Sequence, residues 1–594
     1  MASSTTQARA LLVRQLAAQT GCTPAATKRL VDETAADEGL FARLVDAWVE
    51  TGACLLGPSG PQVFLAQLER LDAPGLAVAA DLRRARALTP TELFRLAQLY
   101  GVLGRTERAA TAFRELWTQA GLPLEYSVRL GIASATSAPE LSLAAADRVA
   151  ETILTRDLEA EDDGPDLLRD APHKAAVLLG LARDVALAAG DPDRAASLAR
   201  AASALWGRLD HPPSRWTAMA QQARTLVAAS QQSKARQVLT RWRDEAQEQG
   251  DAQAEAQAIA SDAERVASEG KLGHAASLLA EAVELLESMG DPAGALTFRE
   301  RQGQLLALEG SWDSAARTFA SARALAEEAS SPDQAASLWV SEGECALRQG
   351  KLSHALRCGE NGRQDASSET LERSTLLVAA VLVAAGDGSR ALKALVRLTD
   401  SEDPRTLARS LELRAELCLG RGDEAGAQLA YADAARAYAG EPRRAAECVV
   451  ARAELALLQG DRERCRALCE RADKVDAPHL DLRHELLQAL LGEPDEAELL
   501  LEDAVERTAE EGHRLDHLRA LHANLGFALT HDRDPDALLE RLGASLAQLR
   551  ETLPEKLRAR FGTSPWVGRL RAFASHPEAG AAIKALVERL GRKG

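Results

Sequence analysis

The stretch LLALEGSWDSAARTFASARAL, from Leu305 to Leu325, decides the fold. An apolar segment with helical spacing runs into Gly310, and a second such segment starts directly after it. Glycine can adopt the left-handed conformation that ends a helix, and Ala315, five residues later, lets the second helix approach the first closely. The stretch therefore predicts a helical hairpin.

The same turn recurs along the chain. A Gly or Ser followed five positions later by Ala, or by Cys in the last copy, returns first every 40 residues and then after 36, 36 and 38 residues. The turn residues are Gly190, Ser230, Gly270, Gly310, Gly350, Gly386, Gly422 and Gly460, with an isolated earlier copy at Gly104. Such a period predicts an array of stacked helical hairpins instead of one compact core.

Most units also carry a small residue seven positions before the turn and a large apolar residue nine positions after it. The resulting pattern, G-x-x-x-x-A-x-x-x-[FYL]-x-x-A, resembles the tetratricopeptide repeat (TPR), and Gly310, Ala315, Phe319 and Ala322 match it in full. The long units are similar to the 40-residue variant found in sensor arms of signal-transduction ATPases and in polarity adaptors. The resemblance implies an all-α, right-handed solenoid of about eleven or twelve hairpins with irregular helical caps.

Composition and charge support this class and exclude others. The 594 residues are 46% hydrophobic but only 4% aromatic, which favours helices over strands. With 71 Lys and Arg against 88 Asp and Glu, the formal charge of −17 argues against a nucleic-acid or anionic-lipid partner for the whole surface. No apolar run reaches the length of a signal peptide or a membrane span, and arginine greatly outnumbers lysine. We expect a cytoplasmic, bacterial protein without membrane insertion.

The repeat pattern divides the chain into five expected parts. They are an N-terminal helical cap over residues 1–90, a short TPR-like segment over 91–155, an acidic loop over 156–172, the main TPR-like solenoid over 173–545 and a basic helical tail over 546–594. The cap is interrupted by a Gly/Pro-rich break over residues 57–61. The tail stands out by charge, because residues 551–594 hold nine Lys and Arg against four Asp and Glu.

No catalytic residue, cofactor-binding residue or metal ligand is expected. The chain lacks a phosphate-binding glycine loop or a nucleophile motif between a strand and a helix. Four histidines, His513, His517, His522 and His531, lie close together, but the zinc interpretation is weaker than that of packing or surface residues, because no HExxH arrangement is present. The eight scattered cysteines are interpreted as reduced core thiols. An enzyme is therefore the weakest functional class.

The first helices of the hairpins carry the informative side chains. By the TPR resemblance, the residue six positions before each turn faces the concave groove, and neighbouring groove positions lie four and seven residues further upstream. The expected partner-binding groove residues are Glu264, Glu300, Gln304, Glu344, Glu412, Glu416, Glu447 and Glu454. A wall of one charge sign attracts a cationic segment, although glutamate is also common on any solvated helix.

The tail offers a candidate ligand for that groove. The stretch RARFGTSPWVGRLRAF, over residues 558–573, alternates arginine with large aromatic residues, as interface anchors do. The expected tail interface consists of Arg558, Phe561, Trp566, Arg569 and Phe573. The tail either caps the last hairpin or docks in the acidic groove. Docking on the same chain would give autoinhibition, and docking on another subunit would give self-association.

The sequence thus favours a non-catalytic scaffold or adaptor that binds a partner protein or a basic peptide in an acidic concave groove. The alternative is a regulatory sensor that binds a peptide or a small ligand and controls a separate signalling enzyme or ATPase. A dry pocket rich in Trp and Tyr would favour the sensor, whereas a long polar groove would favour the scaffold.

Overall fold

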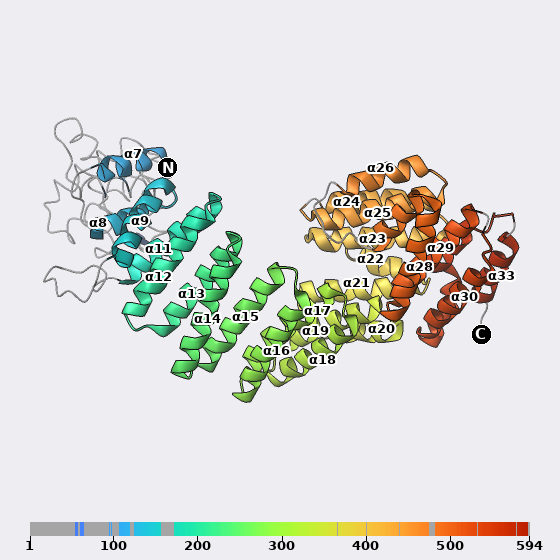
Figure 1. The fold of residues 1–594 in the computed structure, drawn as a ribbon, viewed down its shortest axis with the longest axis horizontal. Helices are drawn as coiled ribbons and strands as arrows, with labels where there is room; N and C mark the ends of the chain where they lie inside the picture. Colours follow the sequence, from blue (N-terminus) through green and yellow to red (C-terminus); the bar gives the residue numbers. More distant parts are fainter. Residues whose placement is uncertain are drawn as a thin grey trace. The chain divides into compact units, whose positions relative to one another are not determined.

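The fold is a TPR-like α-solenoid of helical hairpins (Figure 1). The computed structural model describes residues 54–57, 60–63, 94, 97, 106–118, 124–155, 172–364, 366–399, 401–438, 440–473, 482–531, 533–577 and 579–591. The chain divides into two compact units, residues 1–265 and 266–594, and the boundary falls inside one helix. Among the described residues, no helix is long and apolar enough to span a membrane.

Each unit is an ordered series of helices. Unit 1 contains β1 (Cys54–Gly57), β2 (Gly60–Val63), α7 (Thr106–Trp117), α8 (Leu124–Ser134), α9 (Pro139–Thr155), α11 (Pro172–Ala188), α12 (Pro192–Arg208), α13 (Pro212–Ala228), α14 (Gln232–Gln249) and most of α15 (Ala252–Ser268). Unit 2 continues with α16 (Leu272–Ser288), α17 (Pro292–Glu309), α18 (Trp312–Glu328), α19 (Pro332–Arg348), α20 (Leu352–Asn361), α21 (Ser368–Ala384), α22 (Gly388–Val396), α23 (Pro404–Arg421), α24 (Glu424–Ala437) and α25 (Pro442–Leu458). It ends with α26 (Arg462–Asp473), α27 (Leu482–Leu491), α28 (Pro494–Glu510), α29 (Arg514–Thr530), α30 (Asp536–Glu551), α31 (Glu555–Arg558), η1 (Phe561–Thr563), α32 (Pro565–Ala572) and α33 (Gly580–Gly591).

The turns follow a stricter rule than the sequence pattern indicates. From Gly190 to Gly350, a residue with positive φ stands at every twentieth position. Five of these are the predicted turns inside hairpins, and the other four, Asp210, Gly250, Gly290 and Ser330, connect one hairpin to the next. In this range the left-handed residue lets the chain leave one helix and enter the next within three residues, and each helix between these turns has 17 or 18 residues.

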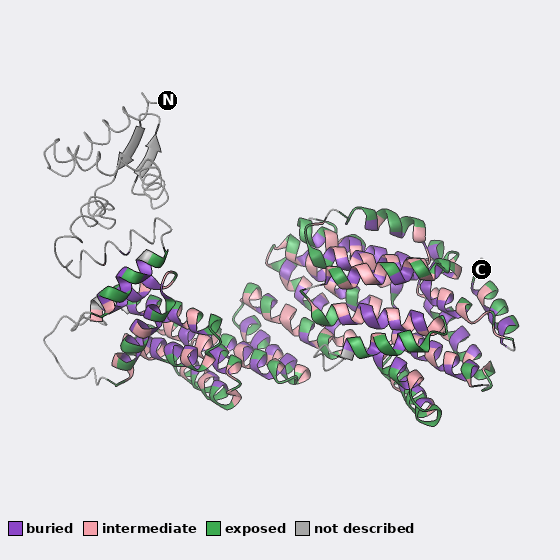
Figure 2. Ribbon diagram, turned by 90° about the horizontal axis from the view of Figure 1, so that it is seen from above, coloured by how far each residue is buried: buried purple, intermediate pink, exposed green. Residues whose placement is uncertain are grey.

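Small residues set how closely the paired helices pack. A Cβ atom added to Gly303 would lie 2.7 Å from the ring of Phe319, so only glycine leaves room for that ring. Ala315 and Ala322 are fully buried in the same hairpin. Buried and exposed residues alternate around the described helices, which is the pattern of stacked amphipathic hairpins (Figure 2). The predicted repeat is thereby confirmed in physical terms.

The expected helical N-terminal cap contains a β-hairpin, which corrects that prediction. Strands β1 and β2 pair antiparallel, with Cys54 opposite Val63 and Gly57 opposite Gly60. Gly57 and Gly60, which pair at the ends of the two strands, lie within the expected Gly/Pro-rich break over residues 57–61. Pro58 and Pro61 in that break disfavour a helix. The rest of the cap and residues 156–171 of the acidic loop lie outside the described residues.

The C-terminal part of unit 2 folds back onto the middle of the same unit. His513 Nε2 lies 3.0 Å from the carbonyl oxygen of Gly310, and the Ser353 amide donates to the Thr552 carbonyl over 2.9 Å. Thr563 Oγ1 donates to the Gly386 carbonyl, also over 2.9 Å. Helix α30 runs without interruption through residues 545/546, where the sequence pattern places the boundary between solenoid and tail.

Two glycines allow α32 to lie directly against α23. A Cβ atom on Gly568 would stand 2.5 Å from the carbonyl oxygen of Leu419, and one on Gly420 would stand 2.5 Å from the carbonyl oxygen of Thr563. Around this crossing, Phe561, Val567 and Leu570 are completely buried in the main core of unit 2. The tail segment is therefore an integral part of that core.

We expect Gly568→Ala to lower the free energy of unfolding by about 1–3 kcal/mol, because the added methyl group meets backbone atoms that cannot move aside. Urea denaturation measures the loss, and hydrogen exchange locates it at α23 and α32. Gly180→Ala is the control, because its Cβ would meet nothing within 4 Å, so helix propensity should raise stability by up to ~1 kcal/mol. Equal effects of the two substitutions would contradict the close crossing.

Candidate functional site

Buried charges join α32 to the first helices of the hairpins. Arg569, on α32, is 4% exposed, and its guanidinium lies 3.1 Å from Glu416 Oε2 on α23 and 2.8 Å from Glu454 Oε1 on α25. Arg483, on α27, lies 3.2 Å from Glu416 Oε1. The Tyr431 hydroxyl donates to that same oxygen over 2.6 Å. Two arginines and two glutamates thus form one cluster in which the positive and negative charges balance.

This cluster is ionised at neutral pH. Burial by itself would raise the pKa of Glu416, but Arg569 and Arg483 hold that pKa well below its usual range. The pKa of Glu454 is lowered against the same burial effect by the same two arginines. Burial and the neighbouring Glu416 carboxylate raise the pKa of Tyr431, which stays protonated. Paired carboxylates of this kind are poor proton acceptors, so the cluster suits binding and positioning better than acid–base chemistry.

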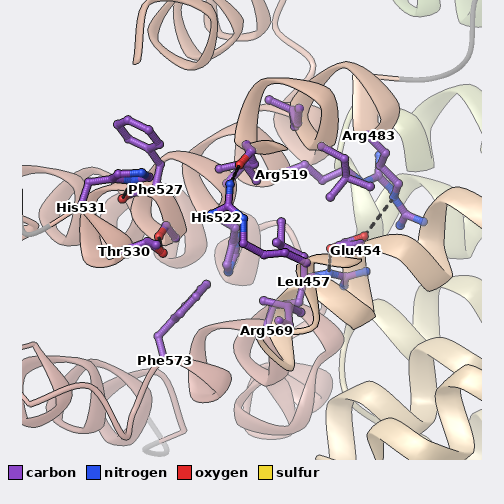
Figure 3. A pocket seen from close by; sticks show the side chains of 18 residues that line it. Glu454, Leu457, Arg483, Arg519, His522, Phe527, Thr530, His531, Arg569 and Phe573 are labelled. Carbon is purple, nitrogen blue, oxygen red and sulfur yellow. Dashed lines mark hydrogen bonds and ion pairs between the residues drawn. The ribbon is translucent and has the colours of Figure 1, made fainter. Parts of the chain in front are cut away.

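A cavity of about 390 Å³ lies next to the cluster, between α25, α27, α29 and α32 (Figure 3). Its body is apolar and is built by Leu457, Leu486, Leu490, Phe527 and Phe573. The Phe573 ring stands across the cavity from the α29 side chains in the close view. A cavity of this size and lining is in the range that holds a small ligand or the end of a peptide.

Cationic groups form part of the cavity lining. Arg519 pairs with Asp516 on its own helix, and its guanidinium lies 5.6 Å from the centre of the Trp566 ring. The side chain of Arg519 is 15% exposed, and its Nε atom is buried without a hydrogen-bond acceptor. Arg462, at the cavity edge, donates to the Leu490 carbonyl over 2.8 Å. Among the residues that line the cavity, Glu454 is the single carboxylate.

His522 is a neutral polar group in the cavity wall. Its Nδ1 lies 2.7 Å from the Leu518 carbonyl oxygen, and its Nε2 lies 3.1 Å from the Trp566 carbonyl oxygen. Burial lowers the pKa of His522 to about 4, with Arg569 adding to the effect. One ring nitrogen therefore donates a hydrogen bond at pH 7, and the ring links α29 to α32 without adding charge.

Several predicted groove residues come together, and all of them have partners within the chain. Glu412 is 7% exposed and pairs with Arg409, and Glu447 lies 2.8 Å from Arg444. Both line a smaller cavity of about 140 Å³ that also touches Glu416 and Trp566. The predicted acidic wall is therefore locally neutralised where α32 lies.

The other predicted groove residues remain accessible. Glu344 has a side chain 54% exposed, 3.7 Å from Arg373, and Gln304 is exposed and accepts a hydrogen bond from Arg301 over 3.1 Å. Glu300 is half-buried and lies 3.4 Å from Gln334 Nε2, and Glu264, in unit 1, is exposed. Within unit 2, Glu300, Gln304 and Glu344 line neither the cavity beside Glu454 nor the smaller cavity beside Glu416.

The tail residues are placed within their own chain. Phe561 and Trp566 are buried in the core of unit 2, and Phe573 lines the cavity. Arg558 donates to the Leu553 carbonyl over 2.9 Å and pairs with Glu551, near the end of α30. Arg569 alone reaches the predicted groove glutamates.

Sequence reasoning missed Arg483 and Arg519 as site residues. The repeat register is lost after α26, and the ten-residue helix α27 that carries Arg483 matches no TPR position. The cluster of four histidines was the available signal for α29, and His522 is one of them. Its two carbonyl contacts are those of a packed histidine, the interpretation that the sequence favours.

No protein-family model and no curated protein matches the chain. A solved Rap protein complexed with competence and sporulation factor is 13% identical, with a TM-score of 0.43, over 57% of this chain and 99% of that one. The apo quorum sensor NprR from B. thuringiensis is 12% identical, with a TM-score of 0.36, over 57% and 98%. The APC/C hetero-tetramer Cut9–Hcn1 is 13% identical, with a TM-score of 0.37, over 89% and 94%. The chain itself has a TPR-like helical-repeat fold.

Proposed function

We propose that this protein is a non-catalytic regulatory scaffold that binds a peptide end or a small ligand in the cavity between α25, α27, α29 and α32. The cavity of about 390 Å³ carries this proposal. In this region α32 occupies the space beside Glu416 and Glu454, so a partly open, largely apolar pocket lies there in place of a long polar groove. The pocket is lined by Leu and Phe and not by Trp and Tyr, so it lacks the aromatic lining expected of the sensor. Its apolar body still suits a small ligand or a peptide end better than a long basic segment, and this supports the sensor alternative.

The lining defines the class of ligand. Leucine and phenylalanine side chains suit an apolar body, and Arg519 offers a cationic partner for one anionic group. A hydrophobic peptide with its terminal carboxylate, or a small amphipathic acid, has this chemistry. Because α32 forms one wall, an occupied pocket stabilises the closed C-terminal region, and the accessible hairpins then present that state to a protein partner.

We expect Arg519→Gln to weaken binding of 1-anilinonaphthalene-8-sulfonate about tenfold, because the sulfonate loses its cationic partner. Binding of N-phenyl-1-naphthylamine, which lacks the sulfonate, should change little. Fluorescence titration of the full chain measures both affinities. Arg533→Gln is the matched control, because Arg533 is exposed and pairs with Glu498 away from the cavity. Equal weakening of both probes, or no change for the sulfonate, would count against the proposed ligand class.

The accessible glutamates support a second candidate, binding of a basic segment of a partner protein. Glu344 carries this candidate, because its carboxylate remains more than half exposed and its nearest cation is 3.7 Å away. A basic segment would bind such a surface mainly through long-range electrostatic attraction, which salt weakens. A basic segment bound in this way would contact the exposed surface around Glu344 and would leave the cavity free for the ligand.

For this candidate, Glu344→Lys should weaken binding of a labelled peptide with the sequence of residues 558–573 about three- to tenfold at low ionic strength. The difference should shrink at high salt. Fluorescence anisotropy with the full chain gives both values. Glu328→Lys, at an exposed position on the second helix α18, is the control for net charge. If the two variants bind equally, the acidic face is not a specific site.

The neutral histidine in the pocket wall gives the closed state a pH dependence. The pKa of His522 is about 4 in the folded chain against an ordinary value near 6.5, so the unfolded chain takes up a proton first as the pH falls. The contribution of His522 is fully present above about pH 6.5 and is lost between there and pH 4. The lowered pKa values of Glu416 and Glu454 act in a separate window, below about pH 4.5.

We therefore expect the free energy of unfolding to fall by about 3 kcal/mol more between pH 6.5 and pH 4 in the wild type than in His522→Gln. Urea denaturation at a series of pH values, followed by tryptophan fluorescence, measures the slope. His274→Gln, at an exposed position on α16, should keep the wild-type slope. Parallel slopes for wild type and His522→Gln would show that the ring is not held neutral.

A further inference from the structure

Three side chains with metal-binding atoms meet between α19 and α20, away from the pocket. Glu342 comes from α19, and His354 and Cys358 stand one turn apart on α20. His354 Nε2 lies 2.9 Å from Glu342 Oε1 and 3.7 Å from Cys358 Sγ, and all three ligand atoms lie within 4.8 Å of one another. We propose that these residues bind one Zn²⁺ or a similar borderline divalent transition-metal ion.

The distances suit a tetrahedral ion. Zinc bonds of about 2.0–2.3 Å to nitrogen, oxygen and sulfur place neighbouring ligand atoms roughly 3.4 Å apart. The two measured separations from His354 Nε2 lie on either side of that value, so small side-chain adjustments are enough. A sulfur, an imidazole nitrogen and a carboxylate oxygen together favour zinc or cobalt over calcium or magnesium. Three protein ligands leave the fourth position to water.

Burial distinguishes this cluster from ordinary surface carboxylates. Cys358 is fully buried and Glu342 is 6% exposed, whereas about a third of the His354 side chain reaches solvent. The ion would therefore be shielded from solvent on the side of Glu342 and Cys358. It would enter past the imidazole of His354. A buried carboxylate beside a thiol is costly unless it is compensated, and an ion supplies that compensation.

Arg323 holds the outer oxygen of the carboxylate. Its Nε lies 3.6 Å from Glu342 Oε2, which is longer than a hydrogen bond, and its guanidinium stacks 3.6 Å from the centre of the Trp339 ring. Glu342 Oε2 accepts no hydrogen bond, whereas Oε1 points to His354. Arg323 also lies 3.0 Å from Glu327, so its positive charge is shared between Glu327 and Glu342. Arg323 can thus orient the Glu342 carboxylate while Oε1 coordinates the ion.

Binding changes the protons of two ligands. In the metal-free arrangement His354 carries its proton on Nε2 and donates to Glu342, while Arg357 lies 3.3 Å from Nδ1. On metal binding that proton moves to Nδ1, the exposed Arg357 side chain swings away, and the Cys358 thiol releases one proton to solvent as its sulfur bonds the ion. From sequence every cysteine was expected to be a core thiol, because the eight cysteines are scattered, form no CxxC pair and sit mostly in apolar helical patterns.

The test uses the full chain, stripped with a chelator and titrated with Co²⁺ and then with Zn²⁺. We expect one ion per chain and a thiolate-to-cobalt charge-transfer band in the near ultraviolet, which Zn²⁺ displaces. Zn²⁺ should also raise the melting temperature. Cys358→Ser should abolish the band, and His354→Gln, at a partly exposed position, should weaken Co²⁺ binding at least tenfold.

Two other buried thiols serve as matched controls. Cys345→Ser changes a buried cysteine of α19, and Cys469→Ser changes the i, i+4 partner of Cys465, so both should keep the band. If Cys358→Ser fails to fold by circular dichroism, His354→Gln decides the outcome. The proposal is overturned if the wild type shows no band, if His354→Gln binds Co²⁺ as the wild type does, or if only Cys469→Ser loses the band.

Discussion

A left-handed residue at each turn is the constraint on which the rest of the structure depends. Because Gly310 and its counterparts end one helix and start the next within three residues, the helices between Gly190 and Gly350 all have nearly the same length. Equal helices place small residues such as Gly303 opposite large ones such as Phe319. The hairpins therefore stack, and side chains of successive first helices come into register. That register is what brings Glu416 and Glu454 within reach of one arginine.

The repeat could be predicted from the sequence because it depends on local signals. A turn residue, an alanine five positions later and an apolar helical pattern all lie within one hairpin. The C-terminal closure depends on contacts between distant residues, such as His513 with Gly310 and Thr563 with Gly386, which no local pattern encodes. The β-hairpin over residues 54–63 was missed for a related reason. A Gly/Pro break ends a helix, but it does not determine whether a strand or another helix comes next.

Only some residues of the candidate site could be predicted from the sequence. Register placed Glu416 and Glu454 on one face, and the composition of residues 558–573 singled out Arg569 and Trp566. Their meeting in one chain, and the neutralisation of that wall by Arg483, required the fold. Arg483 lies on a short helix outside the repeat register, so its charge could not be assigned to the groove from sequence. The pocket exists because these distant pieces enclose space between them.

The close crossing of α23 and α32 also affects how the chain matures during synthesis. The backbone of Leu419 and Gly420 contacts Gly568 and Thr563, which are synthesised well after the hairpins of α21 and α23. Until then the apolar faces of α21 and α23 stay uncovered, although their own hairpins have formed. A chain that stops before α32 would thus have folded hairpins with an exposed apolar surface. Chaperones and proteases recognise such surfaces.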